Sequence, residues 1–216
     1  MEIFISIDGV LRNTIQKFDY HYNEAYLADD VELDNTFEYG VTEPIQNDNI
    51  LNSYKFQSKD EYEFFLYMEY PIEIFGHAGL SYSTTFTDLH KLIFENKDHN
   101  FTLVGLNELG KSRPASLFFL SKNGFLGSNV KFINSGDIEN TWGKCDAWIT
   151  DSKEILDLCP EDKTGIKFKT TYNQYFTYNK EITKLTEIKE PWSNYSEKAI
   201  TSTSTESPSD AEQQTV

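Results

Sequence analysis

Four side chains that could take part in chemistry stand at the ends of short apolar runs in this sequence. Ser6 and Asp8 end the first run, Asn107 follows the second and Asp151 follows the fourth. If the runs are parallel strands of one open sheet, their carboxyl ends lie at a common edge, where such sheets bind ligands. We therefore expect these four residues to converge on one site.

Two cations, Lys111 and Arg113, come shortly after Asn107. Carboxylate oxygens are the ligands that Mg2+ prefers, and fixed positive charge stabilises phosphoryl oxygens. The residue types therefore predict a magnesium–phosphate site. Asp8 and Asp151 are its candidate metal ligands, and Asn107, Lys111 and Arg113 are its candidate phosphate-binding residues.

The elements that must position these residues alternate in type along the chain. Short β-type runs are separated by helical segments, such as an apolar one that begins at Pro114, a residue favoured in the first turn of a helix. This alternation predicts an α/β fold, a Rossmann-like parallel sheet covered by helices on both faces. The predicted strands are 2–7, 101–106, 130–133, 146–150 and 165–168.

The stretch between the first two strands has a different character. Ser58 and Glu61 have the spacing of a capping box, and residues 86–94 carry an apolar stripe at helical spacing. We predict a mainly helical cap inserted at 12–100, with His77 as the cap residue that faces the site.

The remaining boundaries follow from the insertion and from composition. Residues 1–11 and 101–192 then form the core. The Ser/Thr-rich tail 193–216 is too polar to order itself, and we predict that it is disordered.

The segment 3–11, Ile-Phe-Ile-Ser-Ile-Asp-Gly-Val-Leu, resembles the first motif of the haloacid-dehalogenase-like (HAD-like) phosphatases. Residues 101–107 resemble the second-motif strand, and 145–151 resemble the acidic fourth motif of the 5'(3')-deoxyribonucleotidase-like branch, as found in phages. The resemblance implies a HAD-like core, a helical cap after the first motif, a Mg2+ cofactor and Asp8 as general acid/base.

The sequence departs from that pattern where the chemistry is most demanding. The family's nucleophilic Asp is Ser6 here, and one acid of the fourth motif is Thr150. A neutral hydroxyl is a weak nucleophile without a base, and each lost carboxylate weakens Mg2+ binding. We therefore expect a pseudoenzyme that acts as a binding or structural component, with a phage particle or assembly as one setting.

Three other interpretations stay open. The chain could be an active Mg2+-dependent phosphatase acting on nucleoside monophosphates. It could be a nucleotide binder, because 105–112 matches the P-loop spacing and supplies Lys111 and Ser112, although Glu108 would face the phosphate. In the plainest interpretation Asp8 belongs to a turn, Asp151 caps a helix, and the loop cations are solvated.

Composition limits the partners. The formal net charge of −16 at pH 7 argues against nucleic acid and anionic membranes, which attract clustered Lys and Arg. Nine of the thirteen tyrosines fall within 12–100, so we expect a protein partner on a Tyr-rich acidic cap.

No apolar run reaches the length of a membrane span, and two cysteines form no disulfide framework. We expect an intracellular location, in cytoplasm, host cytoplasm or a virion.

Overall fold

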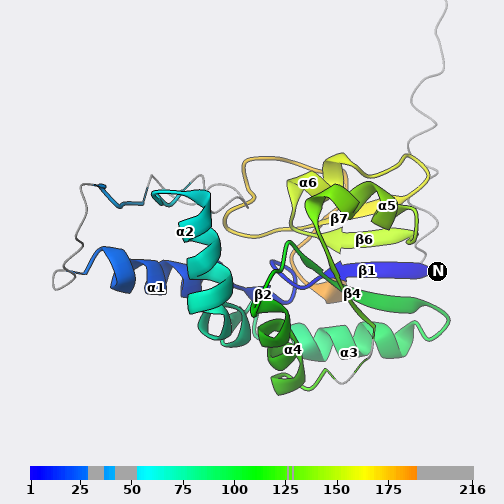
Figure 1. Ribbon diagram of the computed structural model, residues 1–216. Coiled ribbons are helices and arrows are strands. Elements are labelled where there is room, and N and C mark those ends of the chain that lie inside the picture. Colours follow the sequence, from blue (N-terminus) through cyan, green and yellow to red (C-terminus); the bar gives the residue numbers. More distant parts are fainter. Residues whose placement is uncertain (29–36, 42–52, 126, 128, 189–216) are drawn as a thin grey trace, which may run out of the picture.

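The computed structural model describes residues 1–28, 37–41, 53–125, 127 and 129–188 and contains one sheet of six parallel strands (Figure 1). The strand order is β5-β4-β1-β6-β7-β8, so the first strand lies in the middle. The strands are β1 (Glu2–Ser6), β4 (Asn100–Leu106), β5 (Val130–Ile133), β6 (Ala147–Thr150), β7 (Thr164–Phe168) and β8 (Glu181–Ile182). A two-stranded ribbon pairs β2 (Arg12–Asn13) with β3 (Gly79–Leu80).

Helices cover both faces of the sheet (Figure 1). On one face α3 (Thr85–Glu95) and α4 (Ser112–Lys122) pack on a cluster that contains alternate side chains of β1 and β4. On the other face α5 (Ile138–Trp142) and α6 (Lys153–Asp157) pack around Phe4 and Trp148. Strands buried on both faces need continuous apolar runs, and this is why the run pattern predicted them.

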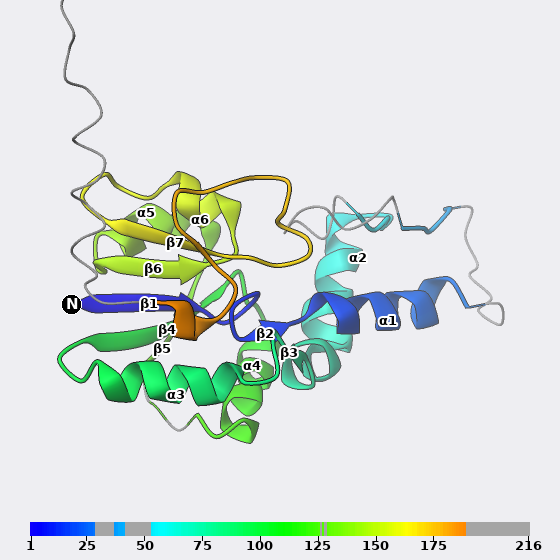
Figure 2. The same cartoon turned by 180° about the vertical axis from the view of Figure 1, so that it is seen from behind.

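A second group of helices extends beyond the carboxyl ends of the strands (Figures 1 and 2). We call α1 (Ile15–Tyr26), α2 (Lys59–Phe64) and the π-helical turns η2 (Phe65–Glu69) and η3 (Ile72–Gly76) the helical unit. Its core is aromatic and centres on Phe18, whose ring lies 4.8 Å from that of Tyr54 and 5.4 Å from that of Phe65.

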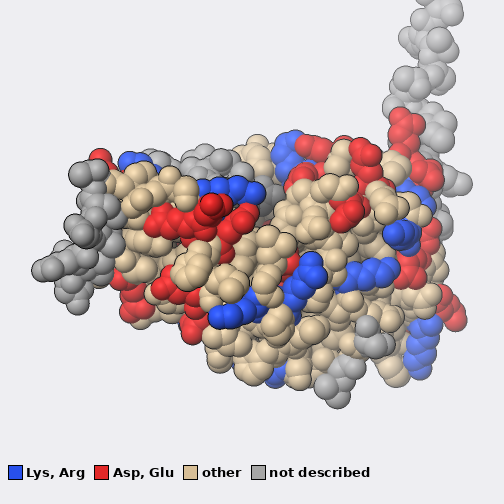
Figure 3. All heavy atoms as spheres, in the orientation of Figure 1, with Lys and Arg blue, Asp and Glu red and all other residues tan. Residues whose placement is uncertain are grey.

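That aromatic core accounts for most of the tyrosines expected on a partner surface. Tyr22 and Tyr54 are buried, and five more of the nine are partly buried against the same cluster: Tyr26, Tyr39, Tyr62, Tyr67 and Tyr70. Tyr20 is 53% exposed. A protein partner therefore stays a prediction that these buried rings do not support, although acidic side chains do gather over the helical unit (Figure 3).

The structure confirms the α/β class and corrects several local expectations. All five predicted strands are present within about one residue, whereas α4 begins at Ser112, two residues before Pro114. The helix after β6 is capped by Ser152, whose Oγ accepts from Ile155 N, and not by Asp151. Ser58 caps α2 as the Ser58–Glu61 spacing predicted.

The predicted insertion, residues 12–100, does not coincide with a single packing unit of the structure. Helix α3 falls inside 12–100, but Phe86, Leu89 and Leu92 pack into the sheet's own cluster, away from the helical unit (Figure 2). An amphipathic stripe shows that a helix has a partner but does not say which layer provides it. The tail 193–216 lies outside the described residues.

Membrane insertion finds no support in these helices. Over the described parts of the chain, no helix combines the length and apolarity that crossing a bilayer would need.

Candidate functional site

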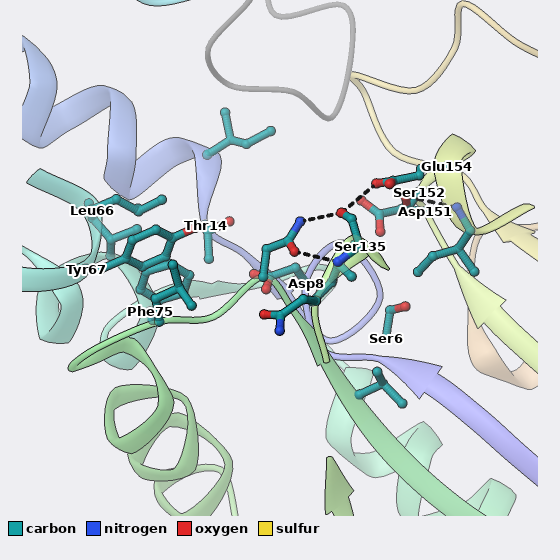
Figure 4. A pocket seen from close by; sticks show the side chains of 18 of the residues that line it. Ser6, Asp8, Thr14, Leu66, Tyr67, Phe75, Ser135, Asp151, Ser152 and Glu154 are labelled. Atoms are coloured by element: carbon teal, nitrogen blue, oxygen red, sulfur yellow. Dashed lines mark hydrogen bonds between the residues drawn. The ribbon is translucent and has the colours of Figure 1, made fainter. Parts of the chain in front are cut away.

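A cleft of about 710 Å³ opens where the carboxyl ends of the strands face the helical unit. Its walls differ in chemistry (Figure 4). One wall is polar and comes from the strand ends and their loops: Ser6, Asp8, Asn107, Asn134, Ser135, Thr150, Asp151, Ser152, Glu154 and Tyr172. The opposite wall is largely apolar and comes from the helical unit: Ile15, Tyr62, Leu66, Tyr67, Ile74 and Phe75.

Ser6 lies on the floor of the cleft with its hydroxyl engaged. Its Oγ donates to Thr150 Oγ1 at 2.8 Å and accepts from Trp148 Nε1 at 3.2 Å, and the residue is 6% exposed. The group that receives the Ser6 proton is therefore a hydroxyl, not a basic carboxylate or imidazole. This arrangement does not activate a nucleophile, which needs an adjacent base or a depressed pKa.

Asp8 sits in a tight loop that returns the chain to itself. Gly9 has φ +72°, Gly9 N donates to Arg12 O, and Arg12 N donates to Ile7 O. The loop places the guanidinium of Arg12 against the Asp8 carboxylate, with Nε to Oδ1 at 2.8 Å and Nη2 to Oδ2 at 2.9 Å. Both carboxylate oxygens of Asp8 are thus held by a bidentate, charge-assisted pair.

Arg12 is the centre of a buried polar network. Its side chain is fully buried, Nη2 also donates to Glu108 Oε1 at 2.9 Å, and Nη1 donates to Ser116 Oγ at 2.5 Å. The guanidinium lies 4.8 Å from the ring centre of Phe75, at the end of η3. One cation therefore joins the loop after β1, the loop after β4, helix α4 and the helical unit.

Two carboxylates share that single guanidinium. Burial raises the pKa of Glu108 to about 7, because the desolvation of its charge and the nearby Asp8 outweigh the attraction of Arg12. A proton on Glu108 would leave Asp8 and Arg12 as a neutral pair. The network therefore balances its charge near neutral pH without any added cation.

Asp151 lies on the other side of the loop after β1. Its Oδ2 accepts from the phenol of Tyr172 at 2.5 Å, and Asn173 Nδ2 donates to its backbone oxygen at 3.0 Å. A Cβ on Gly9 would lie 2.0 Å from Asp151 Cγ, so only glycine fits opposite this carboxylate. Burial raises the pKa of Tyr172 well above its usual value, with the neighbouring Asp151 charge adding to it. Tyr172 is therefore a neutral donor.

Asn107 and Glu154 complete the polar wall through Ser135. Asn107 has φ +54°, its Nδ2 donates to Ser135 Oγ at 2.8 Å, and its Oδ1 accepts from Ser135 N at 2.8 Å. Ser135 Oγ in turn donates to Glu154 Oε2 at 3.1 Å. The amide of Asn107 thus links the loops after β4 and β5, and both of its polar ends face Ser135.

The structure brings together Ser6, Asp8, Asn107 and Asp151 but not the remaining predicted residues. Lys111 is exposed, and its Nζ donates to Met68 O at 3.3 Å. Arg113 donates through Nε to Glu108 O. His77 is exposed, with its ring 5.4 Å from that of Phe118 on α4. None of these three side chains is among the described residues that line the cleft.

The segment 105–112 does not form a phosphate cradle. The carboxylate of Glu108 turns inward, close enough that a Cβ on Gly105 would lie 2.6 Å from Oε1. Lys111 is directed to the backbone of η2, and Ser112 Oγ donates to Leu109 O. An anion in this loop would meet a buried acid instead of converging N–H donors.

The donor set does not fit the magnesium ion that the resemblance implies. Mg2+ prefers an octahedral shell of oxygens with carboxylate charge. Here Asp8 gives both oxygens to Arg12, Ser6 is neutral, and Asp151 accepts from Tyr172. Within the ranges that the structure describes, no three His, Cys, Asp or Glu side chains gather as a metal-ligand group.

Three important residues of the site escaped the sequence analysis. Arg12 follows Asp8 at a spacing of four and is one of only two arginines in the chain, a signal that could have marked it as an ion-pair partner. Glu108 entered only as an objection to a P-loop. Tyr172 lies in a loop between β7 and β8 with no local pattern, so nothing in the sequence could have placed it against Asp151.

Comparison with known proteins adds no family. The chain matches no protein-family model, and no curated protein is similar enough to count as a match.

Proposed function

We propose that this chain is a binding protein, a degraded relative of the HAD-like phosphatases, that takes a small molecule into the cleft without phosphoryl transfer. A cleft of about 710 Å³ is within the usual size range for drug-sized ligands, roughly 300–1,000 Å³. It combines an apolar wall with a few positioned polar groups, which is the common composition of such sites.

One observation carries the proposal: the bidentate hold of buried Arg12 on Asp8. A general acid/base must exchange its proton during the reaction. Both oxygens of Asp8 already accept hydrogen bonds from Arg12, whose Nη2 also donates to Glu108, so Asp8 acts as the partner of a buried cation. Ser6, at the nucleophile position, donates to a neutral hydroxyl. The residues at the nucleophile and the general acid/base positions, Ser6 and Asp8, are therefore both engaged in hydrogen bonds within the protein.

The direct test is phosphate release from nucleoside monophosphates with Mg2+, in the unmodified chain and in Asp8→Asn. We expect no turnover above background in either. Ser6→Asp should remain inactive too, because Arg12 still holds Asp8. Magnesium-dependent turnover that Asp8→Asn abolishes would overturn the proposal.

That outcome would favour the second candidate function, an active phosphatase. The observation in its favour is that Ser6, Asp8 and Asp151 line the same cleft. Its weakness is that the two cations predicted to hold a phosphate, Lys111 and Arg113, donate instead to the backbone oxygens of Met68 and Glu108.

A further inference from the structure

Helix α4 has an apolar outer face that the described chain leaves largely uncovered. Its residues 117–120, Leu-Phe-Phe-Leu, point in four directions, because successive side chains on a helix are about 100° apart. A helix that is apolar all round is normally buried on every side. Here Phe119 and Leu120 are buried against the sheet, whereas Leu117 is 47% and Phe118 is 42% exposed. The outer side of α4 therefore lacks the cover that its composition predicts.

The exposed apolar surface continues from α4 onto the helical unit. A Cβ on Gly76 would lie 2.7 Å from Ile72 Cδ1 and 3.1 Å from Phe118 Cδ1, so these two side chains lie side by side. Lys111 Nζ donates to Met68 O, which brings η2 against the start of α4. Contiguous exposed apolar groups mark interaction surfaces, unlike isolated ones. We call the exposed side chains of this surface the α4 patch: Met68, Ile72, Leu117 and Phe118.

On the α4 side, the patch is bordered by positive charge. The segment 109–136 contains none of the 35 Asp and Glu residues of the chain and four of its 19 Lys and Arg residues. These four, all exposed, are Lys111, Arg113, Lys122 and Lys131. Within an acidic protein, this segment therefore offers a basic surface to a partner of opposite charge.

On the helical-unit side, the patch is bordered by negative charge. Residues 59–73 contain five acidic residues and one basic residue, Lys59. Glu69 is exposed and directly follows Met68, and Glu73 directly follows Ile72. Figure 3 shows acidic side chains over the helical unit and basic ones beside it, toward the sheet. The patch therefore has an apolar centre between a basic and an acidic border.

We propose that two copies of this chain associate through the α4 patch about a two-fold axis, so that the basic border of each copy faces the acidic border of the other. A two-fold axis brings the same surface of both copies together and exchanges its two borders. Such an interface has an apolar centre and a polar rim, the usual anatomy of a protein interface. This inference concerns a surface separate from the cleft and does not depend on the proposed function.

The net charge of the chain does not prevent this association. Two copies at −16 repel each other at long range, but at about 0.15 M salt charges separated by more than about 8 Å are largely screened. The pairs across the interface are closer than that, and complementary pairs there favour one orientation over others.

Sedimentation equilibrium of the full chain tests the dimer directly. Because dimer formation follows mass action, the average mass should rise from the 25.0 kDa of one chain toward twice that value between about 1 and about 100 μM. A monomer over this whole range would overturn the proposal and would leave the α4 patch to an acidic partner of different sequence.

Substitutions on α4 locate the interface. Phe118→Ser and Leu117→Ser should each raise the dimer dissociation constant about tenfold, because apolar anchors near an interface centre contribute most. Both change exposed side chains and should leave the fold intact. Phe94→Ser, at a ring that is 68% exposed on α3, is the matched control and should change the constant by less than about twofold. A dimer that both α4 variants leave unchanged would overturn the assignment of this surface.

A charge exchange tests the two-fold arrangement. Lys111→Glu and Glu69→Lys should each weaken their own dimer about tenfold, because like charges then face each other. Mixed in equal amounts, they should form a heterodimer of nearly the original affinity, since both facing pairs are again opposite in charge. Lys111→Glu mixed with Glu161→Lys, at an exposed acid elsewhere on the surface, is the control and should show no such recovery. Failure of the first mixture to recover would overturn the proposed arrangement.

Discussion

The two regions that meet at the cleft are stabilised by opposite means. Behind the loop after β1, a fully buried guanidinium holds two carboxylates and a serine hydroxyl. In the helical unit, the ring of Phe18 lies among five other aromatic rings. Removing one member of a buried charge network lowers the free energy of unfolding strongly, because a charge is left buried without its partner. In an apolar cluster the loss of stability grows with the side-chain volume that is removed. The comparison predicts different responses to mutation and to pH.

The largest effect is expected from Arg12→Met. It leaves Asp8 and Glu108 close together without their shared cation, a loss of about 3–5 kcal/mol for a broken buried charge network. The measurement is the free energy of unfolding in urea. The chain's other arginine provides the control: Arg113→Met changes an exposed side chain and should cost less than about 1 kcal/mol. Equal losses in the two variants would show that the network does not dominate this region.

Glu108 should make the polar region sensitive to pH. Its folded-state pKa is raised by burial to about 7 from an ordinary value of 4.5, so between these values the folded chain binds more protons than the unfolded one. Its contribution to stability therefore falls as pH rises through this window, by at most about 1.4 kcal/mol per unit.

Glu108→Gln removes the titrating group and provides the comparison. The stability of the unmodified chain relative to Glu108→Gln should decline from about pH 4.5 to about pH 7 and then level off. Urea denaturation at several pH values measures both proteins. A difference that stays constant over this range would mean that Glu108 is ionised throughout.

The aromatic region should respond more mildly and without a pH dependence. Phe18→Leu keeps an apolar side chain of smaller volume at the centre of the rings and should cost about 1–1.5 kcal/mol. Phe64→Leu, at a ring that is 59% exposed, is the matched control and should cost less than about 0.5 kcal/mol. A cost for Phe18→Leu that changes between pH 5 and pH 7 would break the comparison.

The smallest effect is expected at the start of α2. Ser58 Oγ accepts from Glu61 N at 3.1 Å, and Ser58→Ala should cost about 0.5–1 kcal/mol through the lost cap. Ser83→Ala, at an exposed serine in a turn, should be nearly neutral. Thermal unfolding of both variants gives the comparison, and an unchanged midpoint for Ser58→Ala would show that α2 is held by packing alone.

Much of the fold could be predicted because its signals are local. The strands β1, β4 and β6 are apolar runs of four to seven residues, and runs of that kind need burial on both faces. Helix α3 was also predicted from its apolar stripe, but its position was not. Such a stripe shows that one face of the helix is buried, and it does not show which layer of the fold covers that face. The position of the cleft was predicted in part, because the carboxyl ends of parallel strands lie at one edge of the sheet.

The residues of the candidate site show the same division between local sequence signals and contacts made only in the folded chain. The sequence alone determined that a hydroxyl, and not a carboxylate, occupies position 6, and that Asp8 and Asp151 follow apolar strands. Only the tertiary structure decided what these groups contact. A tight loop brings Arg12 to Asp8, and the fold brings Arg12 to Glu108, which is 96 residues away in the sequence. Tyr172 contacts Asp151 from a loop that has no recognisable sequence pattern. Electrostatic partners are set by distance in space, which a linear sequence does not encode residue by residue.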